Sequence, residues 1–270
     1  MKLHKGVSYG PHGERNTLDL YLPEEAGTPR SLVVLIHGGG WCGGGPEAYA
    51  WMGEPLVAHG FAAASVTYRF WPEWPCPAAL DDVSRAVRWL RKHAAEYGFD
   101  AARFGALGGS AGAHLACYLG VAADRPEPDA ELAAYSTRVQ CVIDCYAPTD
   151  LVTMMECASA PLVEGFLGKP LTPQTEADYR AASPYHTLAG APPPFLIVHG
   201  EADTGESLGQ VPIGQSVAFH AKLREAGAEA TLLRLPDAPH GFSGDPGSEH
   251  TQKMWAAALP FLETHLGGSR

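Results

Sequence analysis

The sequence has no long hydrophobic run and comparatively few basic residues. Its longest apolar stretches, such as Leu32–Ile36 and Phe61–Ala64, are far shorter than the roughly 20 residues that a membrane-spanning helix needs. Lys and Arg number 19 against 30 Asp and Glu, which gives a net charge of −11. Because an acidic body repels phosphate backbones and anionic lipid, we expect neither nucleic acid nor a membrane surface as a partner.

Cysteine is also scarce, and its spacing matches no metal motif. The 6 Cys form no CxxC pair, and Cys117, Cys141 and Cys145 lie within apolar segments. We therefore expect buried, reduced thiols, with neither disulfides nor a metal site. Residues 1–10 lack the apolar core of a signal peptide, so we expect a cytoplasmic protein. Apolar residues make up 46% of the chain and charged residues 18%, a globular mixture that excludes wholesale disorder.

Glycine and proline separate segments that alternate between strand and helix patterns. This alternation predicts an α/β fold with a mostly parallel, doubly wound sheet, helices on both faces and a single domain over residues 1–270. Residues 151–194 are irregular and rich in proline, which indicates a short cap-like insertion. In such sheets ligands bind beyond the carboxyl ends of the strands. The expected strands are 16–22 (half-exposed), 31–36 (buried on both faces), 61–68, 103–107, 139–146, 195–198 and 231–235; the expected helices are 47–59, 78–97, 111–123, 212–226 and 249–265.

The first candidate catalytic residue is Ser110. It lies in Gly108-Gly109-Ser110-Ala111-Gly112, which directly follows an expected strand and opens an expected helix. A sharp turn of this kind holds the serine in a strained backbone conformation with its hydroxyl exposed, and it requires small residues two positions away on either side. Gly108 and Gly112 meet that requirement. An ordinary turn with a helix-capping serine is the alternative, but the strand-to-helix context favours a nucleophile.

A second glycine-rich loop, His37-Gly38-Gly39-Gly40-Trp41, follows the buried strand. Consecutive glycines allow a loop to approach the reacting group closely and to turn its amides inward. Such amides stabilise the oxyanion that forms during acyl transfer. A phosphate-binding loop would need the spacing GxGxxG or GxxxxGK[ST], which the sequence does not have here. The expected oxyanion-hole donors are the amides of Gly39, Gly40 and Ala111, with Trp41 as a substitute.

Among the 12 His, His240 is the best candidate for a catalytic base. It lies in Pro239-His240-Gly241-Phe242, a loop between the last expected strand and the last expected helix, and this position satisfies the chain order Ser, Asp, His. His114, four residues after Ser110 on the same helix, is expected to point into the packing. His37 is expected to organise the glycine loop, and His199 to fix a turn at the end of a strand.

The acid that orients the base should lie at a strand end between Ser110 and His240. Asp203 follows the expected strand 195–198 in His199-Gly200-Glu201-Ala202-Asp203. A carboxylate in this role holds the imidazole tautomer and stabilises the imidazolium. The competing carboxylates are Asp150, Glu201 and Glu206.

Large apolar side chains near these motifs are candidates for the wall of a substrate pocket, although about half of them are expected to be core residues. Such a wall, with little room for a large lid in 151–194, favours small or aryl esters over long-chain lipids. The candidates are Trp41, Trp71, Trp74, Met154 and Phe242, with Phe70, Met155 and Phe166 as further members.

Taken together and in order, these motifs resemble the α/β-hydrolase superfamily, in the branch that holds hormone-sensitive-lipase-like esterases, bifunctional feruloyl and acetylxylan esterases, and kynurenine formamidases. The resemblance extends over roughly residues 7–265. The opening Leu18-Asp19-Leu20-Tyr21-Leu22-Pro23, with Tyr9-Gly10 before it, is similar to the feruloyl-esterase-like subgroup, whose members lack a large N-terminal cap. The other matching segments are HGGGW at 37–41, Tyr68-Arg69 with Pro72-Glu73, Pro77–Val83, GGSAG at 108–112, HGEAD at 199–203 and PHGF at 239–242.

The resemblance implies a serine hydrolase that forms an acyl-enzyme and needs no cofactor, with a small ester as its partner and Ser110, Asp203 and His240 as its triad. We expect a carboxylesterase for small or aryl esters, with acetyl and feruloyl sugars among the candidates. An arylformamidase or another amide hydrolase fits the loop at 37–41 equally well. A non-catalytic ligand-binding protein on this scaffold is a third hypothesis, against which the presence of both Ser110 and His240 argues. Homodimers through an edge strand or the terminal helix are common in such folds.

The sequence departs from the family pattern beside the acid. Members usually have Asp-x-x-Val-Pro, whereas Val211-Pro212 lies eight residues beyond Asp203 here. The additional segment Thr204–Gln210 is expected to reshape the pocket or to shift the acid, which keeps Glu206 as an alternative. Ala113 also stands where the family usually has a third glycine.

Overall fold

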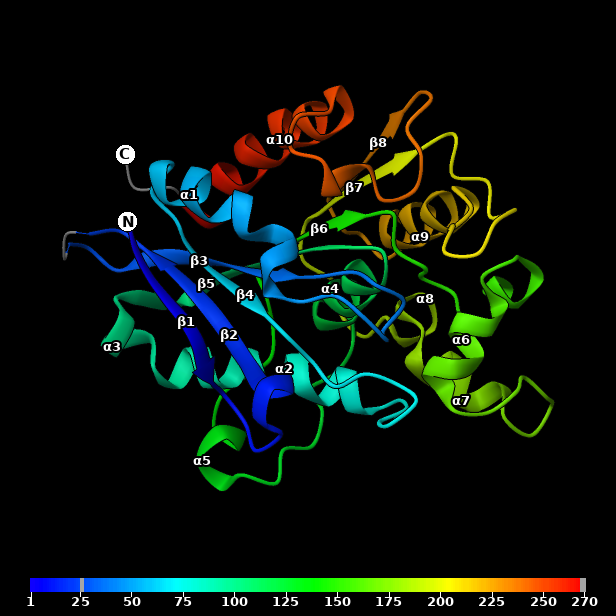
Figure 1. The fold of residues 1–270 in the computed structure, drawn as a ribbon, viewed down its shortest axis with the longest axis horizontal. Helices are drawn as coiled ribbons and strands as arrows, with labels where there is room; N and C mark the ends of the chain where they lie inside the picture. The colour runs from blue at the N-terminus through cyan, green and yellow to red at the C-terminus, as the bar shows by residue number, and fades with distance from the viewer. Residues whose placement is uncertain (25–26, 268–270) are drawn as a thin grey trace.

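The computed structural model describes residues 1–24 and 27–267; residues 25–26 and 268–270 of the domain expected over 1–270 lie outside this description. The strands in chain order are β1 (Lys2–Ser8), β2 (Thr17–Leu22), β3 (Arg30–Ile36), β4 (Ala62–Val66), β5 (Phe99–Gly109), β6 (Cys141–Cys145), β7 (Phe195–Gly200) and β8 (Ala230–Leu235). Within the described residues these eight strands form one sheet in the order β1-β2-β4-β3-β5-β6-β7-β8 (Figure 1). Strand β2 is antiparallel to both of its neighbours, and the remaining pairs are parallel. The α/β class and the mostly parallel sheet are therefore confirmed.

Helices cover both faces of the sheet, as the alternating pattern predicts. One hydrophobic cluster joins the sheet to α1 and α10, through side chains such as Met52 and Met254, and the other joins it to α2, α4 and α9, through Val83, Leu115 and Phe219. The helices are α1 (Ala50–Ala58), α2 (Ala78–Lys92), α3 (Ala94–Tyr97), α4 (Ala111–Val121), α5 (Ala130–Ala133), α6 (Ala160–Leu167), α7 (Glu176–Ala182), α8 (Pro184–Thr187), α9 (Gly214–Glu225) and α10 (Glu249–Leu262).

The structure corrects three details of the sequence prediction. Strand β1 was not predicted, because its side chains are almost all exposed and show no apolar alternation; it forms by pairing with β2. Strand β2 was predicted to be half-exposed, but Leu18–Leu22 is buried, with the ring of Tyr21 packed so closely on α1 that a Cβ at Gly53 would lie 2.2 Å from it. The helix expected over 78–97 breaks at His93 into α2 and α3.

The segment 151–194 contains three short helices, α6 to α8, which lie beside one another at one side of the molecule (Figure 1). Their core residues, among them Val163, Phe166 and Tyr179, join the same cluster as α4. Among the residues that the structure describes, no helix is long and apolar enough to cross a membrane.

The parallel register of the central strands determines where the sequence motifs meet. Gly109 at the end of β5 is paired with Cys145 at the end of β6, and Cys145 is paired in turn with Val198 of β7. Residues that follow these strands therefore lie at one edge of the sheet, beyond the carboxyl ends of the strands.

Candidate active site

Ser110 occupies the sharp turn between β5 and α4. Its φ is +55° and its ψ is −124°, a combination that residues with a side chain seldom adopt and that marks stored backbone strain. Glycine is required on both sides of the turn: a Cβ at Gly108 would lie 2.4 Å from the carbonyl carbon of Gly112, and one at Gly112 would lie 2.0 Å from the carbonyl oxygen of Ile36. The backbone thus fixes the Ser110 hydroxyl at the edge of the sheet.

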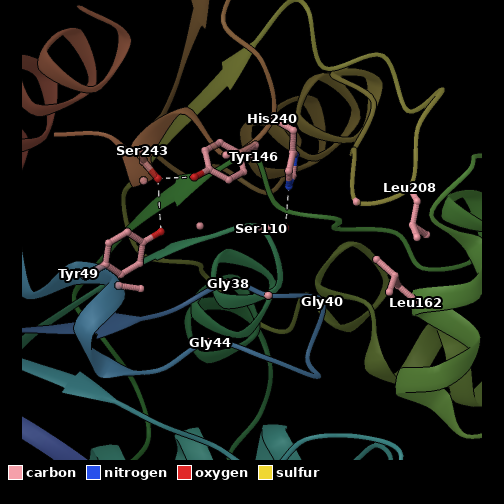
Figure 2. A pocket seen from close by; sticks show the side chains of 16 residues that line it. Gly38, Gly40, Gly44, Tyr49, Ser110, Tyr146, Leu162, Leu208, His240 and Ser243 are labelled. Carbon is pink, nitrogen blue, oxygen red and sulfur yellow. Dashed lines mark hydrogen bonds between the residues drawn. The ribbon is translucent and has the colours of Figure 1, made fainter. Parts of the chain in front are cut away.

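The structure brings Ser110, His240 and Asp203 together in one hydrogen-bonded line. Nε2 of His240 lies 2.9 Å from Oγ of Ser110, and Nδ1 of His240 lies 2.6 Å from Oδ2 of Asp203; Figure 2 shows the first of these contacts. Because a carboxylate only accepts hydrogen bonds, Nδ1 of His240 carries the proton. Nε2 is then free to accept the proton of the Ser110 hydroxyl.

Asp203 is fully buried, and both of its carboxylate oxygens accept hydrogen bonds. The amide of Val211 donates to Oδ1 at 2.9 Å, and Nε2 of His199 lies 3.1 Å from Oδ2. Burial by itself raises the pKa of the Asp203 carboxyl, but the hydrogen bonds from His199 and His240 outweigh it and hold the pKa below its ordinary value. The carboxylate therefore stays charged beside His240.

The competing carboxylates have other partners or face solvent. Glu201 is paired with Arg234 at 2.8 Å, and Asp150 with His186 at 3.1 Å. Glu206, the alternative raised by the additional segment, is exposed. Among the described carboxylates it is Asp203 that contacts His240. The segment 204–210 returns at Val211, whose amide donates to Asp203.

The glycine loop lies against the nucleophile. A Cβ at Gly38 would stand 3.3 Å from Cβ of Ser110, and Gly39 and Gly40, with φ of +108° and +59°, turn the loop around the site. In the described part of the chain no group accepts a hydrogen bond from the N–H of Gly39 or Gly40. Ala111 is the first residue of α4, where backbone N–H groups have no intrahelical acceptor.

Two buried histidines support this loop, and the side chains of both are bonded to groups other than the Ser110 hydroxyl. His37 stacks on the ring of Tyr68 with centroids 4.5 Å apart, and the Tyr68 hydroxyl donates to the His37 carbonyl at 2.9 Å. His114 accepts a hydrogen bond from the indole N–H of Trp41 at 3.2 Å and lies 2.8 Å from the Ala182 carbonyl. Burial lowers the pKa of each histidine to about 4. Both are therefore neutral packing residues at pH 7.

Two cavities meet at Ser110. The larger has a volume of about 610 Å³ and includes His240 and the glycine loop; Tyr49, Tyr146 and Ser243 line one side of it, and Leu162 and Leu208 the other (Figure 2). The smaller has a volume of about 20 Å³. Its lining residues are Gly40, Trp41, Ser110, Ala111, Pro148, Met154, Ser159, Leu162, Val163, Gly209 and Val211.

The large apolar side chains expected to form the wall divide into two groups. Trp41 and Met154 line the smaller cavity, and Trp41 also stacks on Phe166. Trp71, Trp74 and Phe242 line neither cavity. The indole N–H of Trp71 donates to the Gly40 carbonyl at 2.8 Å, Trp74 lies near the ring of His12, and Phe242 packs on Tyr146. Phe70, Met155 and Phe166 are likewise not among the lining residues of these two cavities.

Sequence reasoning missed the walls of the larger cavity. Tyr146 directly follows β6, so it lies at the carboxyl ends of the strands, where the site was expected. Ser243 comes three residues after the expected base His240. These positions in the sequence could have indicated both residues. Leu162 and Leu208 lie in the two segments without a clear pattern, and their positions depend on how those segments pack.

Comparisons with known proteins agree with this architecture. The BD-FAE family model matches residues 18–223. Esterase LipQ of Mycobacterium tuberculosis is 35% identical over 243 residues, which are 87% of this chain and 56% of that protein. The chain spans about three fifths of the length of the curated mycobacterial esterases it matches.

Two solved structures match over almost the whole length of both chains. A truncated carbohydrate esterase from gut microbiota is 29% identical, with a TM-score of 0.82 and coverage of 98% of this chain and 97% of that chain. Thermogutta terrifontis esterase 2, solved in a form phosphorylated by paraoxon, is 26% identical, with a TM-score of 0.82 and coverage of 99% and 96%. The strand order, the turn at Ser110 and the match over 18–223 place this chain in the BD-FAE family, within the α/β-hydrolase superfamily.

Proposed function

We propose that this chain is a serine carboxylesterase that hydrolyses small esters through an acyl-enzyme on Ser110. The observation that carries the proposal is the line from Ser110 Oγ through His240 to Asp203, beside a loop whose amides have no acceptor in the described residues. The esterase names of LipQ and of the two matching structures support it.

The geometry supports a two-step acyl transfer without a cofactor. Nε2 of His240 takes the proton of Ser110 while Oγ attacks the ester carbonyl carbon, and the oxyanion lies against the amides of Gly39, Gly40 and Ala111. His240, held by Asp203, then passes its proton to the leaving alkoxide as the C–O bond breaks. A water molecule repeats the sequence on the acyl-enzyme and releases the acid and the free Ser110 hydroxyl.

The two cavities support different roles for the two halves of the ester. The leaving alcohol is protonated by His240, so it lies in the larger cavity, which His240 lines. The acyl group then occupies the smaller cavity beside Trp41 and Ala111, and a volume of about 20 Å³ fits little more than a methyl group. This favours acetyl over feruloyl as the acyl group, with room for a sugar or an aryl alcohol on the other side.

A panel of nitrophenyl esters of increasing acyl length, run beside N-formylkynurenine, tests the proposal. We expect the highest kcat/KM for acetate, a steep fall for longer chains, and less than about a thousandth of the wild-type rate in Ser110→Ala. Ser8→Ala, on the exposed strand β1, is the matched control and should keep full activity. Paraoxon should inactivate the wild type and leave its phosphoryl group on Ser110.

Two outcomes would overturn the proposal. A Ser110→Ala variant with substantial esterase activity would remove the nucleophile assignment. Faster turnover of N-formylkynurenine than of any ester would identify a formamidase instead.

Cellular location and assembly belong to the same proposal. We expect a cytoplasmic enzyme and a homodimer formed through the edge strand β1 or the terminal helix α10. Sedimentation equilibrium of the full chain would measure its oligomeric state.

A further inference from the structure

Three hydroxyl groups gather on one side of the larger cavity, and the acyl-transfer steps above do not use them. They belong to Tyr49, in the 3-10 turn Pro46–Tyr49; Tyr146, directly after β6; and Ser243, in the 3-10 turn Phe242–Gly244. Each residue is at least 95% buried, yet all three line the cavity. Figure 2 shows the two phenol oxygens converging on the oxygen of Ser243. We refer to Tyr49, Tyr146 and Ser243 as the hydroxyl cluster.

The hydrogen bonds within the hydroxyl cluster leave acceptor lone pairs unused. Oγ of Ser243 lies 3.4 Å from the Tyr49 hydroxyl and forms a closer hydrogen bond with the Tyr146 hydroxyl. The Tyr49 and Tyr146 hydroxyls also interact with each other, and the Ser243 backbone N–H faces the Tyr146 oxygen. Each hydroxyl oxygen has two lone pairs but only one hydrogen, so these donors cannot fill every lone pair of the cluster. The remaining lone pairs are available to a donor in the cavity.

The hydroxyl cluster lies immediately beside the catalytic line, on the side of His240. A Cβ at Gly109, the residue before Ser110, would stand 2.2 Å from the Tyr49 hydroxyl and 2.9 Å from that of Tyr146. The ring of Tyr146 also packs edge-to-face on the ring of His240, with centroids 4.8 Å apart. The leaving alcohol must lie next to His240 to receive its proton. Another group on the same alcohol is therefore within reach of the hydroxyl cluster.

The charge of the cavity restricts the kind of group that would bind there. Its lining residues include no Lys, Arg, Asp or Glu, and apart from His240 they are glycine, alanine, serine, tyrosine and leucine. Nothing in this lining pairs with a phosphate or a carboxylate. A neutral hydroxyl suits it, because a hydroxyl donates to a free lone pair of the cluster and can accept a hydrogen bond from a cluster hydroxyl in turn.

We propose that the hydroxyl cluster of Tyr49, Tyr146 and Ser243 binds a second hydroxyl group of the leaving alcohol, adjacent to the ester. The substrate class is then a short-chain monoester of a polyol, with the free neighbouring hydroxyl as the recognised group. This inference rests on the proposed esterase function. In that mechanism His240 protonates the leaving alcohol, and this step is what locates the alcohol beside the hydroxyl cluster.

Two esters of equal size separate recognition of the hydroxyl from general activity. 2-Hydroxyethyl acetate and propyl acetate differ by a hydroxyl in place of a methyl group, so the ratio of their kcat/KM values measures the contribution of that hydroxyl. We expect the wild type to prefer the hydroxyethyl ester, and Tyr49→Phe and Ser243→Ala each to lower the ratio about tenfold, as the loss of one hydrogen bond to substrate predicts. Tyr179→Phe is the matched control, since its hydroxyl donates to the Lys169 carbonyl away from the cavity.

The possible failures are distinguishable. If the hydroxyl cluster only supports the loop that carries His240, both variants slow the two esters equally and the ratio stays constant, which overturns the inference while the esterase proposal stands. If the folded wild type hydrolyses neither ester, the esterase proposal itself fails. Circular dichroism of each variant establishes that it is folded, and two separate variants ensure that one unstable protein does not decide the result.

Discussion

Nε2 of His199 lies 3.1 Å from the same Asp203 oxygen that lies 2.6 Å from Nδ1 of His240. The carboxylate thus receives hydrogen bonds from two imidazoles at once. Nε2 of His199 also faces the Val211 carbonyl at 2.9 Å, so this nitrogen carries a hydrogen, and the Ser216 hydroxyl can donate to Nδ1 at 2.7 Å. Val211 therefore contacts both residues, which is how the chain returns from the additional segment 204–210 without moving the acid.

This contact makes His199 a positioning residue for the proposed acid. In His199→Leu the Asp203 carboxylate loses a buried donor, so we expect kcat for nitrophenyl acetate to fall at least about tenfold. The pKa of Asp203 should also rise, because a hydrogen bond that lowers it is gone, and the acid limb of the pH profile should move to higher pH. Stopped assays over a pH series would measure both changes.

His199→Gln is the control for this prediction, because its amide N–H can still donate to Asp203. It should recover part of the lost kcat. An unchanged acid limb in His199→Leu would show that His199 serves packing alone.

The sequence predicts the fold wherever burial follows a regular period. Along α2, Leu80, Val83, Val87 and Leu90 recur at helical spacing and all are buried. Strand β1 escapes prediction because an exposed edge strand has no apolar period and is formed by its pairing with β2. The burial of β2 was likewise not predicted, since it depends on α1, which packs there only in the folded chain.

The residues of the candidate site also fall into those that the sequence predicts and those that it does not. Ser110, His240 and Asp203 lie in short motifs whose position at strand ends can be read along the chain, and the parallel register brings them together. The side of the larger cavity formed by Leu162 and Leu208 could not be predicted, because these two residues come from separate irregular segments. Trp71 was expected in the wall but packs on Gly165 and binds the Gly40 carbonyl, an outcome of tertiary packing alone.

Stability should decrease as the pH falls from about 6.5 towards 4. Burial lowers the pKa of His37 and of His114 to about 4, whereas an unfolded histidine titrates near 6.5. In this interval the unfolded chain binds more protons, so the free energy of unfolding falls as the pH is lowered. The stabilisation is complete above about pH 6.5, and its loss amounts to about 3 kcal/mol per histidine.

The buried carboxyl of Asp144 has the opposite effect on the pH dependence of the free energy of unfolding. Burial raises the pKa of Asp144 to about 6, so the folded chain takes up a proton there below pH 6 and gains stability as the pH falls. The combined effect of the two histidines is larger than that of Asp144. The free energy of unfolding is therefore still expected to fall as the pH is lowered. Urea unfolding at pH 7.5, 6 and 5 would measure it, and equal free energies of unfolding at pH 7.5 and 5 would contradict the prediction.

The variant His114→Gln tests whether His114 contributes to this pH dependence of the free energy of unfolding. An amide can accept from the Trp41 indole and donate to the Ala182 carbonyl, as the neutral imidazole does, but it does not titrate. We expect the variant to lose less stability than the wild type between pH 7.5 and 5.

Leu162 and Leu208 provide a test of which cavity holds the acyl group. Both line the larger cavity, but Leu162 also lines the smaller one beside Trp41 and Met154. In Leu162→Ala the smaller cavity gains the volume of a truncated side chain, so kcat/KM for nitrophenyl butyrate relative to acetate should rise about tenfold, the size of effect that a few methylene groups produce in a pocket. Leu208→Ala removes the same atoms from the larger cavity alone and should leave this ratio unchanged. A butyrate preference that shifts only in Leu208→Ala would place the acyl group in the larger cavity and reverse the assignment of the two halves of the ester.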